Sequence, residues 1–172
     1  MVELGSIWPP VGIHAIDAFS LPLLGTCVLL ASGFILTLAH HALILGNKSL
    51  TLFNFLFTVL LGASFILIQF NEYLYASFAI QDSSFGTTFF ALTGLHGLHV
   101  IIGVIFLTVS LLRIFYDAIT YEHHCGIEYS IYYWHLVDLV WIFLFLIVYW
   151  FGGLCYLSFS MVTLSLFSYP WN

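Results

Sequence analysis

The sequence contains very little charge. Only two of its 172 residues are basic, Lys48 and Arg113, and eight are acidic. Charged residues make up 6% of the chain, against about 25% in a soluble domain. Hydrophobic residues make up 62%, so we expect lipid rather than water to surround the protein. Two basic side chains are too few to contact a phosphate backbone, which excludes nucleic-acid binding.

Paired cysteines and familiar catalytic motifs are also missing. The three cysteines form no CxxC pair, so no disulfide framework is expected. The chain has no Ser/His/Asp nucleophile motif, no glycine-rich phosphate loop and no HExxH string. Glu3 and the Pro9-Pro10 pair stand where a cleavable signal would carry a basic and then an apolar region. The residues themselves therefore assign the chain no catalytic group of its own.

Long apolar runs predict the fold. They cover residues of about 21–45, 50–70, 87–115 and 129–151. About 20 apolar residues suffice for a helix to cross a membrane, whereas membrane β-strands are about ten residues long with alternating polarity. The sequence therefore predicts an all-α membrane protein, a bundle of four transmembrane helices over residues 21–151. Gly46-Asn47-Lys48 predicts a tight turn between the first two.

The two ends of the sequence differ from this bundle. Residues 1–20 contain Pro9-Pro10 and are predicted to form an interfacial arm. Residues 152–172 form an apolar C-terminal extension with a short fifth segment at 154–169, which is below the length needed to span.

With four spans, Lys48 and Arg113 fall on the same side. The positive-inside rule then places the loops at 46–49 and 116–128 inside and the N-terminus outside.

Several ionisable residues lie within the apolar runs, where such groups are costly and suggest a function. His96 and His99 are three residues apart on one predicted helix, and His135 and Asp138 repeat this spacing on another. One interpretation is a haem or metal site, and another is a proton relay through His135 and Asp138. The favoured interpretation is a buried polar clasp that fixes helix register, with a histidine of a neighbouring helix donating to Asp138. No spacing here is diagnostic of a metal.

Three further polar residues are candidates. His40 and His41 end the first run, and adjacent side chains on a helix diverge by about 100°, so they cannot easily bind one metal together. We expect them to meet helix C-terminal carbonyls or lipid phosphates. Glu72 falls in the predicted loop 71–86 and completes the candidate buried polar network. No residue is predicted to bind a metal or cofactor.

Two strings resemble a known family. TGLHGLHVIIG at 93–103 and YWHLVDLVW at 133–141 closely resemble the signature of cytochrome c oxidase subunit III. Shorter matches occur in the family's order: WPPVGI at 8–13, LLASG at 29–33, AHH at 39–41, EY at 72–73 and HH at 123–124. Together they cover residues from about 3 to 151.

The resemblance implies a non-catalytic core subunit of complex IV. Such a subunit packs against subunit I, binds phospholipids, and supports sustained proton-pumping oxygen reduction, while haem and copper belong to partner subunits. It favours the polar clasp over a haem site at His96, His99 and His135. The alternatives are subunit III of a bacterial quinol oxidase, an independent di-haem membrane cytochrome and, last, a small transporter.

The sequence departs from the family in length. The family has seven spans and only the last four match, so we expect a split subunit whose first three helices come from a separate chain. The family's buried membrane carboxylate lies in a missing helix, and no residue here inherits its role. The scarcity of Lys and Arg, with 18 Phe and 10 Tyr, fits a multi-pass protein of the mitochondrial inner membrane that is encoded in the organelle.

Overall fold

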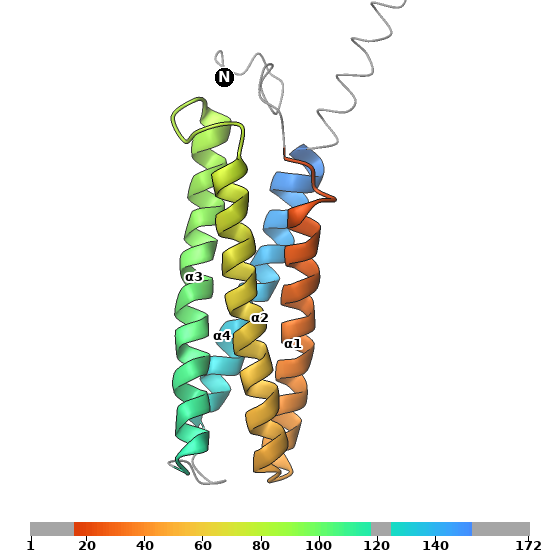
Figure 1. Cartoon of the computed structure of the whole chain (residues 1–172), viewed down its shortest axis with the longest axis vertical. Helices are drawn as coiled ribbons and strands as arrows, with labels where there is room; N and C mark the ends of the chain where they lie inside the picture. The colour runs from red at the N-terminus through yellow and green to blue at the C-terminus, as the bar shows by residue number, and fades with distance from the viewer. Residues whose placement is uncertain (1–15, 118–124, 153–172) are drawn as a thin grey trace, which may run out of the picture.

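The computed structural model describes residues 16–117 and 125–152. In this part the chain forms α1 (Leu21–Ile44), α2 (Lys48–Tyr75), α3 (Ser84–Phe115) and α4 (Cys125–Leu144), and α4 continues into the π-helix η2 (Phe145–Trp150). The helices run up and down beside one another (Figure 1). Most of the predicted arm at 1–20 and of the predicted extension at 152–172, including the fifth segment at 154–169, lies outside the described residues.

The four predicted spans are confirmed. Four helices of the described chain, with 24, 28, 32 and 26 residues, are long and apolar enough to cross a membrane. One boundary differs in a way that matters, because α2 continues to Tyr75 instead of ending near residue 70. Glu72 therefore lies on a helix and not in a loop. Its side chain is buried by neighbouring helices, which an average of hydropathy along the sequence does not detect.

The predicted turn between the first two helices is also confirmed. Gly46 has a φ of 72°, a left-handed conformation that glycine adopts without a steric penalty. The Asn47 amide then donates to the Ala42 carbonyl at 3.0 Å, which satisfies a carbonyl at the end of α1. The Asn47 side chain accepts from the Leu50 amide at 3.2 Å and so caps α2. One glycine and one asparagine thus reverse the chain between two spans.

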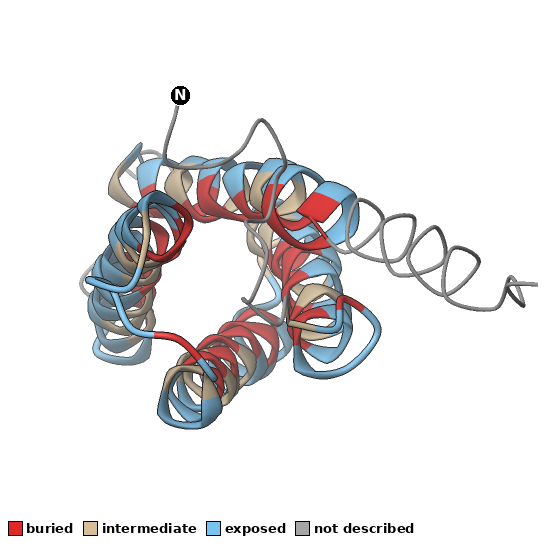
Figure 2. Ribbon diagram, turned by 90° about the horizontal axis from the view of Figure 1, so that it is seen from above, coloured by how far each residue is buried: buried red, intermediate tan, exposed pale blue. Residues whose placement is uncertain are grey.

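The core lies on the inward faces of the helices. Viewed along the bundle, buried residues line the inside of the ring of helices and exposed residues the outside (Figure 2). α1 packs along α2, α3 packs on α2 and α4, and α4 also contacts α1. The outward faces carry large apolar side chains such as Phe34, Leu60, Ile105 and Phe143. This arrangement suits a bundle whose surroundings are lipid.

Trp134 is the side chain through which α4 reaches the other three helices. Its ring is fully buried. A β-carbon placed on Gly62 of α2 would lie 2.6 Å from the ring, and one on Gly103 of α3 would lie 2.9 Å from it. Glycines at these two positions therefore leave the space that the indole fills. Close approach at small residues is the usual way in which helices associate in lipid.

Both basic residues lie at the same end of the bundle, as predicted. The Lys48 ammonium, at the start of α2, lies 2.6 Å from the Asp117 carboxylate just beyond α3. Arg113 belongs to the last turn of α3. The ion pair is largely exposed, so its contribution to stability is small. It marks the end of the bundle that the positive-inside rule assigns to the inner side.

Candidate functional site

Two tryptophans of α4 donate hydrogen bonds to hydroxyls of α1. Trp134 Nε1 donates to Ser32 Oγ at 2.9 Å, and Trp141 Nε1 donates to Thr26 Oγ1 at 3.0 Å. The donors are seven residues apart and the acceptors six, which is about two helical turns on each of two antiparallel helices. These tryptophans were not among the candidate site residues of the sequence. The matching two-turn spacing lets both bonds form on the same pair of helices.

His96 of α3 is buried between aromatic rings. Its ring meets Phe65 edge-on at a centroid distance of 5.9 Å and lies 5.0 Å from Trp141. His96 Nε2 is 3.3 Å from the Val137 carbonyl oxygen of α4, to which it can donate. Its Nδ1 atom is buried without a partner among the described residues. His96 thus joins α3 to α4.

Asp138 faces α1 at Gly33. A β-carbon on Gly33 would lie 2.7 Å from Asp138 Oδ2 and 3.6 Å from His135 Nδ1. Asp138 is only 7% exposed, and its Oδ1 atom has no hydrogen-bond partner in the described part of the chain. The histidine donor expected for Asp138 is absent from these residues, because His96 bonds to a backbone carbonyl instead. A buried carboxyl without a partner is costly, so Asp138 needs a donor from elsewhere.

His99 lies outside the interior polar group, which corrects its place in the predicted network. Its side chain is exposed, and its Nδ1 atom is 2.7 Å from the Leu95 carbonyl oxygen of its own helix. A step of three residues turns a helix by about 300°. This leaves His99 about 60° away from His96, enough to move it from the inward to the outward face.

A second polar group surrounds Glu72, which is 4% exposed. Glu72 Oε2 accepts from Gln69 Nε2 at 3.2 Å, and Oε1 is also buried. The next residue of α2 is Tyr73, whose Oη donates to Thr93 Oγ1 of α3 at 2.8 Å. Tyr149 of η2 is buried in the same region, and its hydroxyl is a hydrogen-bonding neighbour of the Glu72 carboxylate.

The two polar groups are separate. Within residues 16–117 and 125–152, no hydrogen bond links the Glu72 group to His96 or Asp138. The described residues also contain no group of three His, Cys, Asp or Glu side chains that could hold a metal ion. The bonds of Trp134, Trp141, His96 and Tyr73 each join two helices, whereas those of Glu72 and His99 stay within one helix.

His40 and His41 lie at the C-terminal end of α1, with ring centroids 6.5 Å apart. His41 is exposed and His40 is half-buried. The Nε2 atom of His40 is buried and has no partner among the described residues. Of these two candidates for lipid contact, only His41 presents its ring to the surroundings of the bundle.

Four long apolar helices, closed around interior tryptophan, histidine and carboxyl groups, define a multi-span membrane protein. Comparison with known proteins narrows this class. A sequence model of the family described as cytochrome c oxidase subunit III matches residues 1–153. The chain therefore belongs to the cytochrome c oxidase subunit III family, and the resemblance found in the sequence is confirmed.

Individual relatives give the same result. Proteins named cytochrome c oxidase subunit 3 are 53% identical over 152 residues in Schizophyllum commune, 50% over 152 residues in Drosophila melanogaster and 51% over 151 residues in Yarrowia lipolytica. Each match covers 88% of this chain. It covers 57%, 58% and 56% of the respective relative, so the chain spans less than three-fifths of their length.

Proposed function

We propose that this chain is a non-catalytic part of subunit III of mitochondrial cytochrome c oxidase, the proton-translocating complex IV. The observation that carries the proposal is the family match over residues 1–153, together with relatives of that name in fungi and animals at about half identity. In this role the bundle supports the assembly and sustained turnover of subunit I and lies in the mitochondrial inner membrane. Haem and copper belong to the partner subunits.

The interior contacts support a structural role. One nitrogen of His96 lies close to a backbone carbonyl of α4, and one nitrogen of His99 lies close to a carbonyl of its own helix. The two rings also differ in direction, since His96 is buried and His99 is exposed. Such an arrangement suits helix packing better than axial ligation of a shared haem.

The test is purification of the native complex through an affinity tag on this chain. We expect haem- and copper-containing subunits to co-purify, with cytochrome c oxidation that cyanide inhibits. A dinuclear copper centre in the co-purified subunit II supports a cytochrome c oxidase, whereas its absence supports a quinol oxidase. A tagged chain that purifies alone and has its own Soret band would identify a di-haem cytochrome and contradict the proposal.

Two finer expectations belong to the same experiment. We expect the remaining part of the family's length to be supplied by a separate polypeptide, and the chain itself to be encoded in the organelle. Mass spectrometry of the complex tests the first expectation, because one continuous seven-span protein would contradict it. Inhibition of cytosolic ribosomes tests the second, because synthesis of a chain that is encoded in the organelle should continue.

Phospholipid binding is also part of the proposal. His41 is exposed at the end of α1, on the side of the bundle that also carries Lys48 and Arg113. Its imidazole is placed to meet a lipid phosphate, because the chain offers almost no Lys or Arg. A high-resolution map of the complex without ordered lipid near His40 or His41 would contradict this assignment.

A further inference from the structure

His99 is an ionisable side chain on the outward face of a transmembrane helix. It stands in the middle of α3, 15 residues after Ser84 and 16 before Phe115. At 1.5 Å per residue, His99 lies roughly 22 to 24 Å from either end of the helix. The hydrocarbon core of a bilayer is about 30 Å thick, so a span centred in the membrane places His99 near the midplane. Its side chain is nevertheless exposed.

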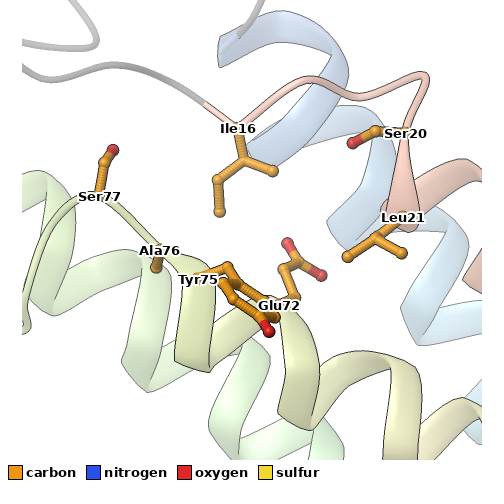
Figure 3. A pocket seen from close by; sticks show the side chains of 7 residues that line it. All are labelled: Ile16, Ser20, Leu21, Glu72, Tyr75, Ala76 and Ser77. Atoms are coloured by element: carbon orange, nitrogen blue, oxygen red, sulfur yellow. The ribbon is translucent and has the colours of Figure 1, made fainter.

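Other ionisable side chains of the spans are placed differently. His96 and Asp138 are buried between helices. The carboxyl of Glu72 is also buried, and it lies at one end of the bundle, beside Tyr75 (Figure 3). An ionisable group in a span almost always faces the bundle interior or pairs with another polar group. Among the described residues, the ring nitrogens of His99 bond to no other helix, so we expect its surroundings to supply a partner.

The bond of His99 within its own helix determines which kind of partner fits. Its Nδ1 atom lies 2.7 Å from the Leu95 carbonyl oxygen. Because a carbonyl oxygen can only accept, Nδ1 carries the hydrogen. In the uncharged ring, which the hydrocarbon favours, the other nitrogen, Nε2, is then an acceptor. The partner of His99 must therefore present an O–H or N–H group.

The surface around His99 is formed by α3 and α4. The Tyr133 hydroxyl of α4 donates to the His99 carbonyl oxygen at 3.4 Å, and the Tyr133 ring packs against Phe106 of α3 with centroids 6.3 Å apart. Residues at steps of three or four share one side of a helix. On this basis the His99 face comprises Leu95, His99, Ile102 and Phe106 of α3 with Tyr133 and Leu136 of α4. Apart from His99 and the Tyr133 hydroxyl, the face is apolar.

We propose that the His99 face binds a transmembrane helix of another polypeptide of the complex, and that a hydroxyl or amide of this helix donates to His99 Nε2. Apolar side chains of the same helix pack on Leu95, Ile102 and Leu136. Acyl chains cannot replace this helix, because they have no donor. A second copy of this chain, packed symmetrically, would bring two acceptor nitrogens together. The inference rests on the proposed function in one respect, which is that a membrane complex surrounds the chain.

The test uses the intact complex, purified through a tag on a haem-containing subunit. Quantitative mass spectrometry measures how much of this chain stays bound as the detergent concentration rises. His99→Leu should dissociate roughly three- to tenfold more readily, because the donor of the partner helix loses its acceptor. If lipid covered His99, leucine would suit the site at least as well, and retention would not fall. His99→Gln, whose side-chain oxygen can accept, should restore most of the loss.

Two adjacent isoleucines provide the matched control. Ile101 and Ile102 are 46% and 45% exposed, but they point about 100° apart around α3. Of the two, Ile102 belongs to the His99 face. Ile102→Trp should weaken retention by crowding the partner helix, whereas Ile101→Trp should be retained as well as wild type.

Three outcomes would overturn the proposal. One is retention of His99→Leu equal to that of wild type, and another is an equal loss with the two isoleucine substitutions. The third is a high-resolution map of the wild-type complex in which acyl chains alone, or residues of this same chain, contact His99 Nε2. The map decides the question even if the variants fail to assemble. Such a helix in a complex without haem would support this inference and contradict the proposed function, so the two can fail separately.

Discussion

Replacement of Gly103 by alanine tests whether Trp134 holds the bundle together. The added β-carbon would lie 2.9 Å from Trp134 Cε3 and 3.1 Å from Cζ3. The ring has little room to move away, because it packs closely on Gly62, where an added β-carbon would lie only 2.6 Å from it, and its Nε1 is bonded to Ser32. Overpacking of a tight core typically costs about 1–3 kcal/mol, and we expect a loss in this range.

Gly97 on the same helix is the matched control. A β-carbon on Gly97 meets no atom within 4 Å. Both substitutions give the gain of about 1 kcal/mol that alanine has over glycine inside a helix. The difference between Gly103→Ala and Gly97→Ala therefore isolates the contact with Trp134. It should equal about 1–3 kcal/mol, which is roughly a five- to 150-fold change in the unfolding constant.

Unfolding of the chain in detergent micelles by added SDS, followed by far-ultraviolet circular dichroism, measures this difference. The same two glycine substitutions, made in a protein that also carries Trp134→Phe, complete a double-mutant cycle. If the indole is the obstacle, the smaller phenyl ring should remove at least half of the penalty of Gly103→Ala. The reasoning is refuted if Gly103→Ala and Gly97→Ala unfold alike, or if the penalty is the same in both backgrounds.

Other substitutions test the remaining contacts. Ser32→Ala leaves the buried Trp134 N–H unpaired and should cost about 1–3 kcal/mol in the same titration; no change would contradict the bond. Asp138→Leu should reduce the amount of assembled complex and leave its haem spectra unchanged, because Asp138 packs on α1; altered spectra with normal assembly would argue against this. His96→Ala should cost about 2–5 kcal/mol by leaving a cavity. His99→Ala, at an exposed site, should stay within about 0.5 kcal/mol, and equal effects of the two histidines would refute their assigned positions.

The span count could be predicted because each helix contains more than 20 consecutive, mostly apolar residues. The end of α2 could not be predicted from hydropathy, since Asn71 and Glu72 lower the local average. The spacing of apolar and small residues along α2 would have indicated that the helix continues. The buried residues of α2 recur every three or four positions up to Glu72: Thr51, Asn54, Phe55, Thr58, Gly62, Phe65, Gln69 and Glu72. Had this period been followed, Glu72 would have been placed on an inward helical face.

The hydrogen bonds between the tryptophans of α4 and the hydroxyls of α1 could not be predicted from the sequence, for a different reason. Trp134 and Ser32 are 102 residues apart, and their contact depends on how the antiparallel helices α1 and α4 are rotated about their axes. Local patterns indicate which face of a helix is buried, but they do not indicate which residue of a neighbouring helix lies opposite.

The buried polar atoms that lack a partner argue that the bundle is completed by other groups. Within the described chain these atoms include His40 Nε2, His96 Nδ1 and Asp138 Oδ1, and native interiors leave few such groups unsatisfied. Asp138 needs a donor, yet the described chain has only two cationic residues that carry charge at every physiological pH, and both lie at one end of the bundle. The relatives contain a further two-fifths of their length that this chain does not span. Neighbouring helices can supply a donor to Asp138, whereas Glu72 already has the Gln69 amide and the Tyr149 hydroxyl beside it.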